Sequence, residues 1–263
     1  MTVQDIVLEF PNIAMKFSEM NTGQRDEDSK YAADRICEVM GLEIKKTPVD
    51  ANGLKQYLLG NVGDEESQLA IYWSTRSNYM YNLCIGLSYN EGPCTTDPSG
   101  DETYAAVLAS RNSAQVFYGL KVVKNAKGSL FYLYLNSYST SSVISAQMNL
   151  SSIAPDNGTF FKIDNVIYKY YSNYLYRRYP ATTTKTIRWD GKLEFPLINI
   201  YKYNYLFPLQ NGFTNEEFKG LFYLGTNNTY SPLEKILIDG KKYFIFKRVS
   251  DNHYYIALDE AGV

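Results

Sequence analysis

The spacing of hydrophobic residues along the chain changes near residue 46. Before that point they recur every three or four positions, the spacing of a helix face, at Val3, Ile6, Val7, Phe10, Ala14 and Phe17. Thr2 and Asp5 resemble an N-terminal cap, whereas Pro11 interrupts the pattern. We therefore expect two short helical pieces, or one kinked helix, over residues 2–17.

A further helix is expected before residue 42. Its hydrophobic face consists of Ala32, Ile36, Val39 and Met40, and Gly41 is well placed to end it. The polar run over residues 21–30 predicts a loop, and residues 42–45 alternate as the start of a strand. Because short helices seldom persist without partners, residues 1–46 are expected to form a helical arm for assembly. Its deletion would then leave a folded β-unit.

From residue 55 the hydrophobic period is two, which predicts β-strands. One strand face is formed by Tyr79, Tyr81, Leu83, Ile85 and Leu87. Residues 125–128 read as a hairpin turn between residues 116–123 and 130–135. Asp164-Asn165, Asp190-Gly191 and Asp239-Gly240 lie between β-forming runs and tolerate the positive φ of tight turns, so each predicts a hairpin.

The end of the chain carries the clearest pattern. Residues 235–238, 241–246 and 254–258 predict a three-stranded meander, with turns at Asp239-Gly240 and at residues 250–253. The one helix expected late in the chain spans residues 214–221, with Thr214 as its cap.

Together these elements predict a mainly β protein. We expect antiparallel sandwich or barrel-like sheets with a short helical N-terminal segment, α+β by count. Polar stretches at residues 137–142 and 149–157 favour a boundary near residue 150. The predicted domains are the arm (1–46), a β domain (47–150) and a second β domain (151–263) that ends in the meander. One continuous sandwich with a long surface loop is the alternative.

Composition narrows the classes of function. The 263 residues include 25 Tyr but only one His, the residue that most often shuttles protons or binds metals. Lys and Arg number 26 against 28 Asp and Glu, so the chain has no excess of positive charge for binding the phosphates of a nucleic acid. No stretch is apolar enough to span a membrane, and Asp5 stands where a secretion signal carries basic residues. A β-rich binding or assembly protein is favoured over an enzyme.

Chemical motifs add little to this picture. His253 reads as an exposed turn residue, and Cys84 and Cys94 could form a disulfide but are expected to be free thiols. Glu43-Ile44-Lys45 resembles half of a metal-dependent nuclease site but reads better as a strand edge. Asp97–Glu102 could hold calcium but reads better as a tight acidic turn. We therefore expect no catalytic residue, no cofactor and no metal.

Aromatic residues are the candidate contact sites. Tyrosines that alternate along a strand present every second ring on one face, where the rings could stack on sugars, meet another subunit or fill a core. The candidate contacts with a partner or a glycan are Trp73, Tyr168, Tyr170, Tyr174, Tyr176, Trp189, Tyr201, Tyr203 and Tyr205.

Tyrosine- and serine-rich β segments such as Ser129–Tyr134, and the closing hairpin Leu237–Phe246, carry a resemblance. In the composition and pattern of these segments the chain resembles structural proteins of tailed bacteriophages and of related prophage-encoded particles from low-GC Gram-positive hosts. The resemblance implies a non-enzymatic virion protein of the tail or head–tail junction, made in the host cytoplasm. Its partners would be copies of itself and other virion proteins. A glycan- or receptor-binding module, and less so a polysaccharide-acting enzyme, are the alternatives.

Overall fold

The computed structural model describes most of the chain. The described residues are 2–8, 10, 12, 15, 19–77, 80–89, 91–93, 105–112, 114–125, 130–139, 159–171, 174–178, 187–192, 205–210, 217–231, 233–250 and 253–259.

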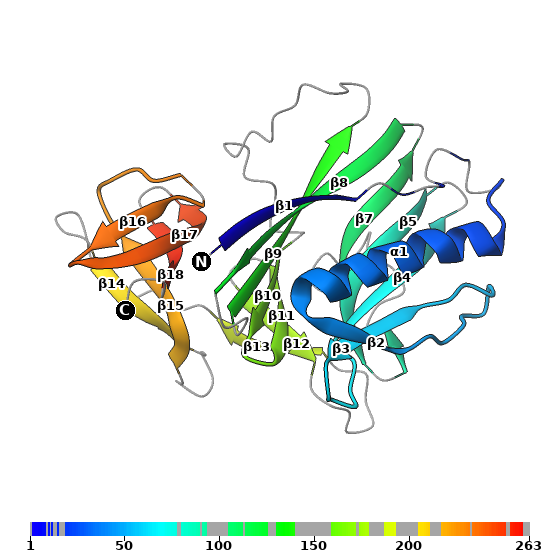
Figure 1. Ribbon diagram of the computed structural model, residues 1–263, viewed down its shortest axis with the longest axis horizontal. Coiled ribbons are helices and arrows are strands. Elements are labelled where there is room, and N and C mark those ends of the chain that lie inside the picture. Colours follow the sequence, from blue (N-terminus) through cyan, green and yellow to red (C-terminus); the bar gives the residue numbers. More distant parts are fainter. Residues whose placement is uncertain are drawn as a thin grey trace.

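One helix and eighteen strands make up the described elements (Figure 1). In chain order they are β1 (Thr2–Leu8), α1 (Thr22–Met40), β2 (Leu42–Lys46), β3 (Tyr57–Asn61), β4 (Leu69–Ser77), β5 (Met80–Tyr89), β6 (Gly92–Pro93), β7 (Ala105–Asn112), β8 (Ala114–Lys124), β9 (Leu130–Ser139), β10 (Thr159–Ile163), β11 (Val166–Tyr171), β12 (Tyr174–Arg178), β13 (Ile187–Lys192), β14 (Tyr205–Gln210), β15 (Glu217–Gly225), β16 (Lys235–Ile238), β17 (Lys241–Ser250) and β18 (His253–Leu258).

The strands form two antiparallel sheets. The larger has 13 strands, in the order β13-β12-β11-β10-β9-β8-β7-β5-β4-β3-β2, with β1 beside β8 and β6 beside β5. The smaller has five, in the order β14-β15-β18-β17-β16, and lies at the left in Figure 1. The mainly β class predicted from the sequence is confirmed. The described strands do not close into a barrel, and the sheets are sandwich-like.

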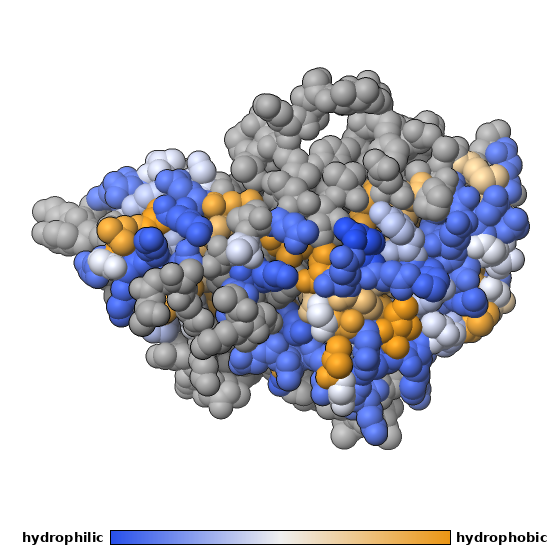
Figure 2. Space-filling model, in the orientation of Figure 1, coloured by the Kyte–Doolittle hydropathy of each residue, from blue (hydrophilic) through white to orange (hydrophobic). Residues whose placement is uncertain are grey.

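The helix α1 packs on the larger sheet, in front of β4 and β5 in Figure 1. Ala32, Ala33 and Ile36 are fully buried in the core cluster that also contains Leu59, Ile71 and Ile85 of the sheet. The opposite side of the helix is hydrophilic, as the blue surface over α1 in Figure 2 shows. The larger sheet continues to β10 and β11, whose Phe160 and Ile167 join the same core. The N-terminal segment is therefore part of this core.

The polar run at residues 21–30 was predicted to be a loop, but it forms the first half of α1. The Asn21 side chain accepts a hydrogen bond from the Gln24 N–H, and the Gln24 side chain accepts one from the Asn21 N–H, both at 2.9 Å. This capping box satisfies backbone donors that the first turn would leave without partners. The predicted end is confirmed: Gly41 has a φ of 63° and its N–H bonds to the Cys37 carbonyl. The strand expected after it is β2.

Helical spacing also misled the prediction for residues 2–17. Residues 2–8 form β1, which pairs with β8 from Thr2 opposite Lys124 to Leu8 opposite Tyr118. The β-branched residues Val3, Ile6 and Val7 favour a strand, and β8 supplies the hydrogen-bonding partner.

Two predictions late in the chain were likewise overturned by pairing between strands. The helix expected over residues 214–221 was wrong, because residues 217–225 form β15, where Gly220 has a φ of 78°. Asp190-Gly191 lies inside β13, where Leu175 faces Gly191 and Tyr176 faces Trp189 across a shifted register. This pair therefore marks a β-bulge, a feature that shares its preference for glycine with hairpin turns.

The hairpins at Asp164-Asn165 and Asp239-Gly240 are confirmed, as is the pairing of β8 with β9. The C-terminal meander is also confirmed as β16, β17 and β18. The predicted boundary near residue 150 lies outside the described residues. The strands on either side of it, β9 and β10, pair within the larger sheet. The chain passes from the larger to the smaller sheet between β13 and β14.

The turn at Asp239-Gly240 gives a direct test of the meander. Both residues have positive φ, 49° and 78°, as a tight two-residue hairpin requires. A Cβ at Gly240 meets no atom within 4 Å, so Gly240→Val acts through backbone strain alone. We expect a loss of about 1–3 kcal/mol in the free energy of unfolding. Urea denaturation measures it, with Lys242→Val on the exposed side of β17 as the control. Equal stability of the two variants would contradict the turn geometry.

Candidate functional site

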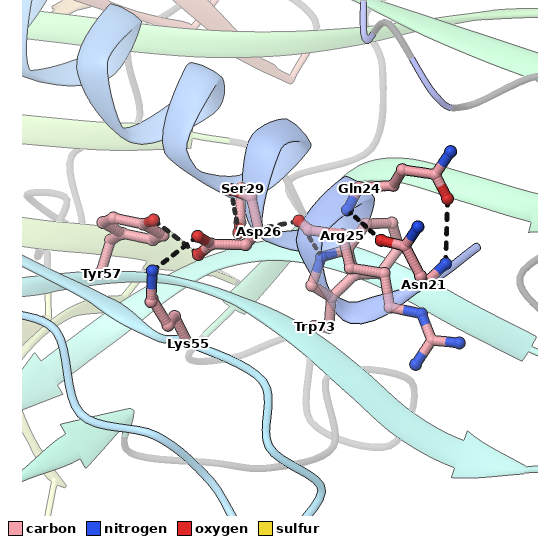
Figure 3. A network of polar contacts seen from close by, with 8 residues as sticks. All are labelled: Asn21, Gln24, Arg25, Asp26, Ser29, Lys55, Tyr57 and Trp73. Atoms are coloured by element: carbon pink, nitrogen blue, oxygen red, sulfur yellow. Dashed lines mark hydrogen bonds and ion pairs between the residues drawn. The ribbon is translucent and has the colours of Figure 1, made fainter.

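A network of polar side chains joins the first half of α1 to β3 and β4 (Figure 3). The Tyr57 hydroxyl donates to Asp26 Oδ1 at 2.6 Å, and Lys55 Nζ contacts Asp26 Oδ2 at 2.7 Å. Both carboxylate oxygens thus have partners. Burial, and then the hydrogen bond to Asp26, raise the pKa of Tyr57, so the phenol stays protonated and acts as a donor. The three side chains fasten α1 to the sheet.

Trp73 supplies a second fastening point in the same network. Its indole N–H donates to the Arg25 carbonyl at 2.9 Å, and the Ser29 hydroxyl donates to the same carbonyl at 3.0 Å. The indole is 7% exposed. Within this network each hydrogen bond connects the helix to itself or to the sheet, so its geometry is that of a structural brace.

Asp28 is the most unusual charged group in the helix. The residue is fully buried, and Oδ1 accepts from the backbone and side-chain N–H groups of Asn12 at 3.2 and 3.3 Å. Oδ2 is buried with no hydrogen-bond partner. Burial raises the pKa of Asp28 from 3.8 to about 6, although the Asn12 hydrogen bonds oppose the shift. Asp28 therefore holds Asn12 against α1 and destabilises the fold when it ionises.

This arrangement predicts a pH dependence. Because the folded-state pKa is raised, the stabilisation is present below about pH 4 and is lost as the pH rises to about 6. Asp28→Asn should remove that loss and raise the free energy of unfolding at pH 7 by about 1–3 kcal/mol, with the gain shrinking toward pH 4. Urea denaturation at both pH values measures it, with the exposed Asp34→Asn as the control. A less stable Asp28→Asn protein at pH 7 would contradict the prediction.

Lys162 holds the C-terminal end of α1, and the β10–β11 turn holds the end of β3 and the residue before β4. The Lys162 ammonium, on a residue 7% exposed, donates to the Met40 carbonyl at 3.1 Å and so caps the helix C-terminus. Burial lowers the pKa of Lys162. The Asn165 carbonyl accepts from Asn61 Nδ2 and Gln68 Nε2, each at 2.7 Å. These contacts join strands that lie about a hundred residues apart in the chain.

The cysteines in the described part of the chain are unreactive. Burial is the main reason that the pKa of Cys37 is raised to about 12, so its thiol stays protonated at neutral pH. Cys84 is fully buried and is not part of a disulfide. Cys94 lies outside the described residues.

His253 was predicted to be an exposed turn residue, and that was wrong. It is the first residue of β18, opposite Gly225, and is half-buried. Its ring stacks on Tyr223, with centroids 5.5 Å apart and planes inclined by 18°, and Nδ1 contacts the Tyr223 hydroxyl. Burial raises the pKa of Tyr223 to about 12. The pair therefore fills space between neighbouring strands.

Glu43 and Lys45 on β2 form an ion pair at the edge of the larger sheet. The hydrogen bond from Lys45 is the main reason that the pKa of Glu43 is lowered. This placement is the strand edge that the sequence favoured over a nuclease site. Among the described residues no group of three His, Cys, Asp or Glu side chains could hold a metal, and Asp97–Glu102 lies outside them.

The structure separates the predicted contact residues. Trp73 and Tyr168 are 7% and 6% exposed, so their rings belong to the core and are not available to a partner in this fold. Tyr176 is half-buried, packs against the core and lies opposite Lys169 and Trp189 in register. Tyr170 lies on β11, Tyr174 on β12 and Tyr205 on β14. Tyr201 and Tyr203 lie outside the described residues. For the residues other than Trp73 and Tyr168, a contact role stays a prediction.

The side chains that hold this region together were not among the predicted sites. They are Asp26, Asp28, Lys55, Tyr57 and Lys162. One signal was present: Asn21 and Gln24 have the spacing of a capping box, which would have started the helix at residue 22 and placed Asp26 and Asp28 on it.

Comparison with known proteins adds no relative: no family model, no curated protein and no solved structure matches the chain. Among the described residues, α1 is not apolar enough to qualify as a membrane-spanning helix.

Proposed function

We propose that the chain is a non-enzymatic structural component of a bacteriophage virion, of the tail or head–tail junction, that assembles in multiple copies. Its partners would be copies of itself and other virion proteins. The phage assignment rests on the resemblance carried by Ser129–Tyr134 and Leu237–Phe246.

The observation that carries the proposal is that the polar side chains of the described network make contacts that hold the fold together. Asp26, Lys55 and Tyr57 fasten a helix, Lys162 caps it, and His253 stacks within a sheet. The edge strand β16, in contrast, presents a large hydrophobic residue to solvent, Leu237 at 67% exposure. A fold stabilised by these contacts, with an edge strand that can pair with another chain, suits a subunit that is repeated in an assembly.

A glycan-binding module is the second candidate. The observation that favours it is the adjacency of β11, β12 and β13, which places Tyr170, Tyr174, Tyr176 and Trp189 on neighbouring strands at one end of the larger sheet. By register Tyr174, Tyr176 and Trp189 share one face of the sheet, where aromatic residues can stack on sugar rings, whereas Tyr170, opposite Leu175, lies on the other face.

Sedimentation velocity on the purified full chain separates the two candidates. The structural proposal expects multimers of defined size that form as concentration rises. A monomer at all concentrations that binds purified Gram-positive cell-wall glycan would favour the module and contradict the structural proposal.

A further inference from the structure

The strand β16 lies at one edge of the smaller sheet and exposes a hydrophobic side chain there (Figure 1). Burial alternates along it: Ile236 and Ile238 are each 7% exposed and join the core of this sheet, whereas Leu237 is 67% exposed. The Lys235 side chain is 53% exposed and its ammonium lies 3.0 Å from the buried carboxylate of Asp259. An exposed leucine thus occupies the middle of an edge strand.

The backbone N–H and C=O groups of Leu237 point away from β17, the only strand that β16 pairs with in the described part of the chain. The two-residue turn makes Ile238 and Lys241 the closing hydrogen-bonded pair, so the next pair, Leu237 and Lys242, is not hydrogen-bonded. Consistently, the Lys242 carbonyl accepts on its other side from the Asp259 N–H at 2.9 Å. The N–H and C=O of Leu237 are therefore directed outward, ready to pair with another strand.

We propose that β16 strands of two copies pair antiparallel about a two-fold axis through Leu237. The order Ile236-Leu237-Ile238 is symmetric about Leu237 in this register. Leu237 meets its own counterpart and exchanges two backbone hydrogen bonds with it. Lys235 keeps its ion pair with Asp259 and Asp239 lies in the turn, so the contact between the two copies is confined to residues 236–238.

The same register extends the hydrophobic layer. Ile236 of one copy faces Ile238 of the other, and both side chains point to the buried side of their sheets. The two smaller sheets become one continuous sheet, a two-fold contact in which the same patch serves both subunits. The reason to choose a second copy over an unrelated peptide is the symmetry of β16 about Leu237, which has a buried isoleucine of the same core on each side. The proposal deepens the proposed function, because it names one surface through which copies associate.

Cysteine cross-linking of the full chain tests the register. In a hydrogen-bonded antiparallel pair the two Cα atoms lie about 5.5 Å apart, within the range that a disulfide spans. Leu237→Cys should therefore form covalent dimers under mild oxidation. The matched control is Lys242→Cys, exposed and directly opposite Leu237 on β17, but one strand farther from the axis. It should give no more dimer than the wild type, and equal cross-linking of the two variants would overturn the proposal.

Sedimentation velocity gives an independent readout. Leu237→Lys should abolish the dimer while the thermal melting temperature stays that of the wild type, because the side chain is exposed. A Leu237→Lys protein that dimerises like the wild type would overturn the proposal. If that variant still forms larger assemblies, the β16 contact fails but the virion proposal stands. Dimers that never grow further would support the β16 contact and count against the virion proposal.

Discussion

Deletion of residues 1–46 is expected to abolish the cooperative unfolding transition of the larger sheet. The deleted segment contains β1, which pairs along β8, and α1, whose Ala32, Ala33 and Ile36 are fully buried. It also contains β2, the partner of β3. Removing them would expose one face of the core and one edge of the sheet. Circular dichroism during thermal denaturation measures the loss.

Two single substitutions give the graded version of this test. Ile36→Ala should lower the free energy of unfolding by about 2–5 kcal/mol, because it empties a filled site in the core. Lys30→Ala on the outer side of the same helix should cost less than about 0.5 kcal/mol, since it removes only the exposed ion pair with Asp34. A truncated protein that melts cooperatively at the wild-type temperature would restore the view of this segment as a separate arm.

Gly60→Ala is expected to destabilise the fold although it adds only one methyl group. A Cβ at Gly60 of β3 would lie 2.2 Å from the Glu66 carbonyl oxygen, which is backbone and cannot rotate away. That close approach is fixed nearby by the hydrogen bond from the Gln68 N–H to the Leu59 carbonyl at 2.8 Å. The loop would have to shift, at a cost of about 1–3 kcal/mol or more.

Urea denaturation checks this prediction. Val62→Ala, in the same loop at 69% exposure, is the control and should change the free energy of unfolding by less than about 0.5 kcal/mol. A Gly60→Ala protein as stable as the control would show that the loop does not cross β3 so closely.

Local patterns predicted the elements whose signals lie within a few residues. The meander followed from β-forming runs around Asp239-Gly240, and the end of α1 followed from Gly41 after a hydrophobic face. These features depend on backbone preferences and on neighbours in the chain, which the sequence displays directly.

The failures came where a distant partner decides the structure. Val3, Ile6 and Val7 have helical spacing, but β8, more than a hundred residues away, supplies the backbone partner that makes a strand. Lys162 and the helix end that it caps are separated by 122 residues. Trp73 was a candidate contact because it is a large aromatic residue, yet its bond to Arg25 depends on how α1 lies on β4. No local pattern encodes such contacts.

Quantitative mass spectrometry of phage particles purified from the host that carries this gene tests the central claim most directly. A structural component is expected at multiple copies per particle, in a fixed ratio to the other structural proteins, and resistant to removal by high salt. Absence of the chain from intact particles that contain their other structural proteins would contradict the proposed role as a virion component.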